Sequence, residues 1–149
     1  IRQNKAMASI FTKIIDGQIP GNFVWADDQC VAFADINPHT DGHVLVVPRQ
    51  EVSSYLEASD ELLAHLTVVA KRIGQAQVKA FDAPRSGLAI VGFDVDHLHL
   101  HVLPIYQGGD LDSTKVRQGE PLEKIAAAMD KLRAALRENG WAQFVPAND

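Results

Sequence analysis

The chain has 149 residues, 46% of them hydrophobic and 22% charged, which is the composition of an ordinary globular domain able to enclose one core. Its formal net charge of −5 at pH 7 argues against general binding to nucleic acids or anionic membranes. This charge is compatible with a small phosphorylated ligand held by neutral donors. No apolar run is long enough to cross a bilayer. The single cysteine, Cys30, has no partner for an internal disulfide, which favours a reducing compartment, and we expect a cytoplasmic protein.

The first expected elements come after a short leader. Residues 1–6, IRQNKA, differ in character from the rest of the chain, and we expect them to be a leader remnant in front of a natural start at Met7. Residues 9–16 place apolar side chains at helical spacing, with Ser9 as N-cap and Gly17 as the stop, and predict a short helix. Three apolar runs then predict strands over residues 23–26, 30–36 and 43–48.

The second half of the chain adds two longer helical patterns and two strands. Ser59 is placed to cap a helix that runs to about residue 81, since apolar residues recur there every three or four positions. The remaining elements are strands over residues 87–93 and 97–106 and a helix over residues 121–140.

This order of elements predicts an α+β fold, because short loops join most neighbouring strands and therefore favour antiparallel pairing. We expect a mostly antiparallel sheet of about five strands, a short N-terminal helix, one long central helix and a C-terminal helix. We also expect residues 7–107 to form the main domain, with residues 108–149 as a loop and helix that pack on it.

The stretch DHLHLHVLP, residues 96–104, carries three histidines at alternate positions: His97, His99 and His101. In a strand these residues project from one face, and the leucines and valine between them project from the other. Three imidazoles in strict alternation are unusual for the polar face of a strand, so the pattern favours a functional site over simple solvent exposure.

Two kinds of chemistry fit this histidine pattern. A His-x-His pair can chelate zinc, although the backbone positions of His97 and His101 are roughly 13 Å apart at the rise per residue of a strand. Alternatively, one imidazole attacks phosphorus while its neighbours orient it and supply protons, since an unperturbed pKa near 6.5 suits either role at neutral pH.

The run from His97 to Leu103 resembles the signature of the histidine triad (HIT) family, His-φ-His-φ-His-φ-φ, in which φ is apolar. The segments 9–20 and 27–48 are similar to the family's opening helix and its following hairpin and strand, including the histidine at position 43. The resemblance covers about residues 8–107 and implies a HIT-like fold. It points to the branch of nucleoside phosphoramidases and dinucleoside polyphosphate hydrolases.

The resemblance implies a hydrolase or transferase that cleaves a P–N or P–O bond at the α-phosphate of a nucleotide. His99 would attack phosphorus and form a nucleotidyl-histidine, which water then releases. His101 would contact the phosphate and help the leaving group depart, while His97 and His43 would hold His99 in the right tautomer and angle. The scheme needs no metal and no cofactor.

The family's nucleotide pocket can also be located on this chain. The resemblance assigns the base-binding positions to Ile10, Phe11, Ile14, Phe33 and Ile36. Asp35 would accept the two ribose hydroxyls, a role that suits an ionised carboxylate. The expected ligand is a purine nucleotide or nucleoside phosphoramidate, held beside His99 and His101. Relatives of this kind form homodimers, and we expect one here.

The sequence departs from the family pattern at the zinc site that many bacterial members carry. Ser9 and Thr12 stand where those members have a Cys-x-x-Cys, and Gln50 is expected in place of a further histidine. Only His97 remains of the four ligands, so we expect no structural zinc.

A second departure lies just before the triad. The loop over residues 91–97 is about six residues shorter than in the family and lacks its asparagine, and Asp94 stands where a serine hydroxyl is usual. A carboxylate beside a phosphate is unfavourable, so Asp94 either turns away, binds a cationic part of the substrate, or raises the pKa of a histidine.

Three functions therefore compete on the sequence alone. The first is the nucleotide hydrolase just described. The second is a nucleotide-binding or interaction module with little catalysis, left by the shortened phosphate loop. The third is a divalent-metal binder that uses His97 and His99.

Overall fold

The computed structural model describes residues 8–147, so the expected leader at residues 1–6 lies outside the described residues. The main elements are α1 (Ile10–Ile15), β1 (Phe23–Ala26), β2 (Cys30–Ala34), β3 (Val44–Pro48), α2 (Asp60–Ala80), β4 (Arg85–Ala89), β5 (Leu100–Ile105) and α3 (Leu122–Leu136). Short 3-10 or π turns span Gly108–Leu111, Ser113–Lys115, Arg137–Trp141 and Ala142–Phe144. None of the helices in this described part is both long and apolar enough to span a membrane.

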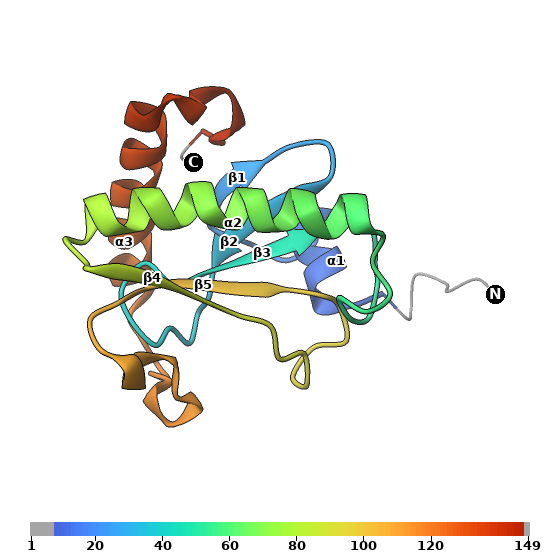
Figure 1. Ribbon diagram of the computed structural model, residues 1–149, viewed down its shortest axis with the longest axis horizontal. Helices are drawn as coiled ribbons and strands as arrows, with labels where there is room; N and C mark the ends of the chain where they lie inside the picture. The colour runs from blue at the N-terminus through green and yellow to red at the C-terminus, as the bar shows by residue number, and fades with distance from the viewer. Residues whose placement is uncertain (1–7, 148–149) are drawn as a thin grey trace.

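The five strands form one antiparallel sheet in the order β1-β2-β3-β5-β4, which confirms the predicted α+β class. In Figure 1, α2 runs across the sheet and α3 stands at the side of β1. Alternate residues of β2 pack on opposite sides: Ala32 faces α2 and α3, whereas Val31 and Phe33 pack with Phe11 of α1. The sheet therefore has the two long helices on one face and the short helix on the other.

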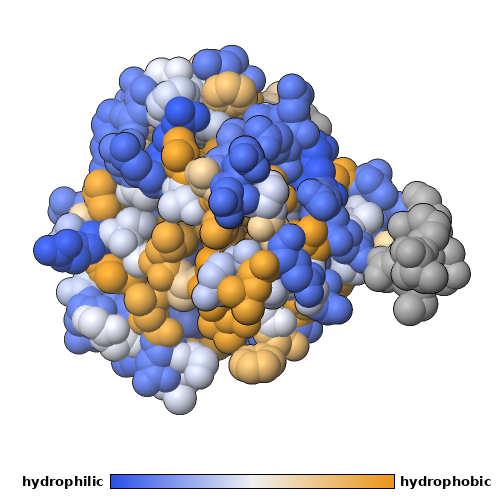
Figure 2. Space-filling model, turned by 45° about the vertical axis from the view of Figure 1, so that its right-hand side comes forward, coloured by the Kyte–Doolittle hydropathy of each residue, from blue (hydrophilic) through white to orange (hydrophobic). Residues whose placement is uncertain are grey.

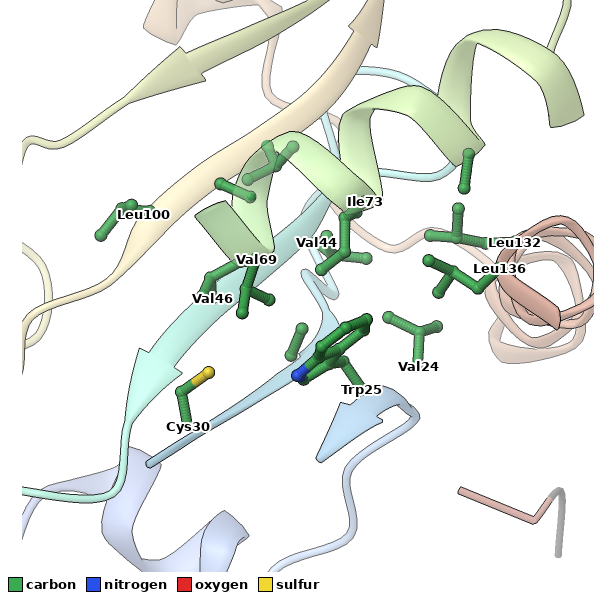
Figure 3. Packing of buried hydrophobic residues seen from close by; sticks show 14 of the residues in the cluster. Val24, Trp25, Cys30, Val44, Val46, Val69, Ile73, Leu100, Leu132 and Leu136 are labelled. Atoms are coloured by element: carbon green, nitrogen blue, oxygen red, sulfur yellow. The ribbon is translucent and has the colours of Figure 1, made fainter. Parts of the chain in front are cut away.

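The larger core lies between the sheet and the two long helices. Trp25 of β1 is fully buried there, against Leu132 and Leu136 of α3 and Ile73 of α2 (Figure 3). The Trp25 ring also stacks on Phe144 at 4.7 Å, which ties the segment after α3 to the sheet. Burial of this large aromatic is among the strongest sources of packing stability in the domain.

The predicted strand boundaries that flank the histidines are wrong. β4 ends at Ala89 instead of residue 93, and β5 begins at Leu100 instead of residue 97. Ala89 pairs with His101, and beyond this pair the two strands separate around a turn in which Gly92 has φ of +89°. The N–H of Leu98 donates instead to the carbonyl of Val52, at 2.8 Å. His97 and His99 therefore lie in the segment before β5, which does not pair with β4.

Candidate active site

His97 is a fully buried side chain with both ring nitrogens hydrogen-bonded. Nε2 lies 2.8 Å from the carbonyl oxygen of Pro48, and Nδ1 lies 2.7 Å from the hydroxyl of Ser9. A carbonyl only accepts hydrogen bonds, so Nε2 carries the proton and Nδ1 accepts from Ser9. Burial lowers the pKa of His97, which agrees with a neutral ring. The alternation predicts His97 on the face opposite Leu98, but the α1 segment covers that face through Ser9 and Phe11, so the ring is buried instead of exposed.

His99 follows two residues later and is fixed by the backbone of His97 instead of its ring. The Nδ1 of His99 lies 2.7 Å from the His97 carbonyl oxygen, so Nδ1 carries the proton and the lone pair is on Nε2. Within residues 8–147, Nε2 makes no hydrogen bond, and the ring borders an open cavity although the residue is only 4% exposed. An imidazole with its nucleophilic nitrogen directed at a cavity is the arrangement that attack on an electrophile requires.

His43 and His101 form a second pair across β3 and β5. The N–H of His39 donates to Nδ1 of His43, so the proton of His43 is on Nε2, which lies 3.0 Å from Nδ1 of His101. His101 therefore accepts at Nδ1 and keeps its own proton on Nε2. Burial lowers the pKa of His43 well below its ordinary value and that of His101 to about 4. Both rings are neutral at pH 7.

These contacts differ from the expected roles of His97 and His43. Neither ring is hydrogen-bonded to the ring of His99: His97 uses its carbonyl, and His43 contacts His101. The reason is the register, which places Leu45 of β3 opposite His101 and thus puts the nearby His43 beside that ring. The sequence shows the four histidines but not which of them pair.

A cavity of about 770 Å³ joins the histidines to α1 and β2, and its size is typical of a small-molecule site. The structure brings all of the expected nucleotide-binding residues to its wall: Ile10, Phe11, Ile14, Phe33, Asp35, Ile36, His99 and His101. His97 and His43 lie behind this wall. Phe11 packs edge-on against both His97 and His99, with ring centroids 5.9 and 5.0 Å apart.

Asp35 connects the cavity to the second histidine pair. One carboxylate oxygen accepts from the N–H of Asn37 at 2.8 Å, in the turn after β2. This turn begins earlier than predicted, because β2 ends at Ala34 instead of residue 36. The other oxygen lies 3.5 Å from Nε2 of His43 and 3.9 Å from Nδ1 of His101. Burial raises the pKa of Asp35. No pattern in the sequence predicts this contact, because it depends on the alignment of three strands.

The sequence reasoning also missed a wall of the cavity formed by the C-terminal part of the chain. Residues of α3 and the following segment contribute to it: Leu122, Ile125, Ala126, Arg133, Pro146 and Ala147. The guanidinium of Arg133 is 4% exposed and donates to the carbonyl of Phe23 and to Asp130, each at 2.8 Å. No local motif predicts this arrangement, because it results from packing between segments that are distant in the sequence.

The residues at the family's zinc position do not fit a zinc ion. Ser9 and Thr12 offer neutral hydroxyls, and these are already hydrogen-bonded, to His97 and to Glu51. Zinc prefers thiolate and imidazole ligands, so of this group only His97 and the carboxylate of Glu51 are common zinc ligands. The fourth member of this hydrogen-bonded group is Glu51, the residue after Gln50. Because both nitrogens of His97 are engaged, the divalent-metal interpretation also loses support.

Residues 16–108 match the HIT domain family model. Over 115 residues the chain is 36% identical to an uncharacterized HIT-like protein of Methanocaldococcus jannaschii, covering 74% of this chain and 87% of that protein. A Zn-bound histidine triad family protein from Mycobacterium smegmatis superposes with a TM-score of 0.79 at 28% identity, covering 92% of this chain and 99% of that one. A hypothetical histidine triad nucleotide-binding protein of Sulfolobus tokodaii strain7 gives 0.74 at 29% identity, covering 87% and 92%.

Proposed function

This chain belongs to the HIT domain family, and from that premise we propose that it cleaves a P–N or P–O bond at the α-phosphate of a nucleotide through a nucleotidyl-His99 intermediate. The observation that carries the proposal is the pair of tautomers at the cavity wall. His99 presents a lone pair on its Nε2, and His101 presents the N–H of its own Nε2. The centroids of the two rings are 5.1 Å apart. One ring can attack phosphorus while the other donates to the phosphate or the leaving atom.

The reaction proceeds in two displacements. Nε2 of His99 bonds to the α-phosphorus as the bond to the leaving nitrogen or oxygen breaks. The bound phosphate anion favours the charged form of His101, which takes up a proton from solvent at Nδ1. The Nε2–H of His43 then donates to Asp35, 3.5 Å away, instead of to His101, and Asp35 is the counter-charge of the charged ring. His101 then gives its Nε2 proton to the leaving atom. In the second displacement the water oxygen bonds to phosphorus as the bond to Nε2 of His99 breaks, and the unprotonated Nε2 of His101 accepts a proton from that water. The nucleoside monophosphate leaves, His101 returns its extra proton to solvent, and His99 is unmodified.

Trapping the intermediate tests this proposal. The protein is mixed with adenosine 5′-phosphoramidate labelled at phosphorus, quenched in alkali, digested and mapped by mass spectrometry. An acid-labile, alkali-stable adenylyl group on the peptide that contains His99 is the expected result, together with release of AMP. Calorimetric binding of AMP without turnover of any phosphoramidate would instead support the nucleotide-binding module.

Charge around the cavity favours an amine leaving group over a polyphosphate. Asp94 and Asp35 both line it, and of the lining residues within 8–147 only Arg133 is a cation, already bonded to Asp130. We propose that the substrate is a nucleoside phosphoramidate whose amine leaving group is cationic, stabilised by Asp94. A leaving polyphosphate would carry negative charge toward the same carboxylates.

Asp94→Asn therefore changes selectivity between leaving groups. We expect kcat/KM for the phosphoramidate of AMP with the lysine side-chain amine to fall about tenfold, because roughly 1.4 kcal/mol of charge stabilisation is lost at this exposed site. The same change leaves hydrolysis of diadenosine tetraphosphate unchanged or faster. Asp28→Asn, on the exposed β1–β2 turn, is the matched control and affects neither substrate. Equal losses on both substrates would show that Asp94 does not select the leaving group.

We also propose that the protein is a homodimer that joins two sheets at β4. This strand lies at the sheet edge, and it and the following turn expose Leu88, Val91 and Phe93, with Phe93 93% exposed. Hydrophobic side chains also gather in the lower half of the face in Figure 2. A free edge flanked by apolar side chains suits a symmetric contact with a second copy. Sedimentation equilibrium is expected to give twice the chain mass of 16.3 kDa, and a mass of one chain at about 100 μM would contradict the proposal.

A cytoplasmic location is the compartment we propose. Cys30 is a free and fully buried thiol, and burial raises its pKa. A protein that keeps its only thiol reduced is suited to a reducing compartment. Purine nucleotides are also available there as ligands.

A further inference from the structure

A compact group of polar side chains ties α1 to the first histidine of the triad. The Ser9 hydroxyl lies 2.7 Å from Nδ1 of His97 and accepts the N–H of Thr12 at 3.0 Å. Glu51, which follows β3, accepts from the Thr12 hydroxyl at 2.5 Å and from the N–H of Ser9 at 3.1 Å. We call Ser9, Thr12 and Glu51 the α1 clamp.

The donor and the acceptor of each side-chain hydrogen bond in the α1 clamp can be assigned. The Pro48 carbonyl requires the proton of His97 on Nε2, so Nδ1 accepts and the Ser9 hydroxyl donates to it. The Thr12 hydroxyl donates its proton to Glu51. Burial alone would raise the pKa of Glu51, but hydrogen bonds from Thr12 and Ser9 outweigh it and lower that pKa, so the carboxylate is ionised at neutral pH. Charge-assisted bonds of this kind are stronger than neutral ones.

The α1 clamp reaches the proposed nucleophile through the backbone. With both nitrogens of His97 fixed, the peptide carbonyl of His97 is also fixed, and this carbonyl accepts the Nδ1 proton of His99 at 2.7 Å. That single hydrogen bond sets both the tautomer and the angle of the His99 ring. The α1 clamp therefore acts on the reacting nitrogen only indirectly, through His97.

We propose that the α1 clamp is a metal-free positioning device: its hydrogen bonds lock His97 and thereby aim Nε2 of His99. The inference rests on the proposed function for its kinetic part. The hydroxyls and the carboxylate satisfy each other's hydrogen bonds, so the group holds its shape without an ion. Positioning residues of this kind alter the chemical step more than substrate binding, because their side chains do not line the cavity.

Ser9→Ala and Glu51→Gln test the positioning role. Each is expected to lower kcat at least about tenfold with KM changed less than about twofold, whereas Ser9→Thr, which keeps the hydroxyl, restores most of kcat. The matched control is Thr67→Ala, which removes a hydroxyl from the exposed face of α2. In ¹⁵N spectra of the imidazoles, Ser9→Ala shifts Nδ1 of His97 and mixes the tautomers of His99. Unchanged spectra and unchanged kcat in both variants would overturn the proposal.

A metal-replacement variant supplies an independent test. S9C/T12C/E51H, with His97, provides two thiolates and two imidazoles, and we expect it to bind one zinc per chain and to give the intense visible absorption of tetrahedral cobalt. Zinc is expected to raise kcat of this variant at least about tenfold over its metal-free form, and chelator treatment leaves wild-type kcat unchanged. Wild-type protein that binds one equivalent of cobalt through His97 would overturn the proposal. If the wild type hydrolyses no phosphoramidate, the function fails, but the imidazole spectra and cobalt binding still decide the role of the clamp.

Discussion

Replacing His99 by Asn is expected to lower kcat on an adenosine phosphoramidate by at least about three orders of magnitude. The amide introduced at this position can still donate to the His97 carbonyl, so the local backbone keeps its support, but no nitrogen lone pair remains to attack phosphorus. A residual rate from binding and from the His101 donor sets the lower limit. Single-turnover kinetics and trapping of the adenylyl group measure the loss directly.

The matched control for this variant is His65→Asn. His65 lies on α2, outside the cavity, where its Nε2 pairs with Asp27 at 2.7 Å. Its replacement is expected to change kcat less than about twofold. Thermal unfolding of the His99 variant should remain cooperative and within a few degrees of the wild type, since the ring is replaced by a side chain that keeps its hydrogen bond. An active His99→Asn protein would exclude this residue as the nucleophile.

Lowering the pH from 6.5 to 4 is expected to remove about 3 kcal/mol from the free energy of unfolding through His101 alone. Its pKa in the fold is about 4, chiefly because burial disfavours the charged ring, against 6.5 in the unfolded chain. Between these values the unfolded chain binds the proton and the folded one does not, so the stability is complete above pH 6.5 and lost as the pH falls to 4. His43 and His97, whose pKa values are also lowered by burial, add to the loss.

Urea unfolding at several pH values between neutral and about 4 measures this effect, with His101→Gln as the comparison. Gln keeps a polar side chain but does not titrate, so its stability should fall less steeply over the same interval. Asp35 acts in the opposite sense, because its pKa is raised in the fold and protonation favours the folded state. Asp27, with a pKa of about 2 in place of 3.8, contributes only at still lower pH. Identical slopes for the two proteins would contradict a buried, neutral His101.

Much of the architecture is readable from sequence because each element carries a local signal. Ser9 and Ser59 cap α1 and α2 as their positions predict, and the apolar spacing of α2 matches its buried face. The predicted strand boundaries beside the histidines were wrong for a physical reason. Whether residues 97–99 join the sheet depends on where β4 separates from β5, and the alternation of apolar residues does not contain that information.

The site shows the same division between local and distant signals. The alternation of His97, His99 and His101 indicates the chemistry, and the family resemblance locates residues that the fold brings to one cavity. Which nitrogen carries each proton depends on carbonyls and amides of other segments, such as Pro48 and His39. Glu51 was missed because the loop after β3 has no periodicity from which to assign its register.

The cavity wall combines Ile10 near one end of the described chain with Pro146 and Ala147 at the other. A ligand bound there contacts both end segments and so links parts of the chain that are far apart in the sequence. Because it binds only when both segments are in place, a nucleotide at about 100 times its dissociation constant adds about 2.7 kcal/mol to the free energy of unfolding. Occupancy by metabolites would then govern how long the molecule resists proteolysis, as well as whether it turns over substrate.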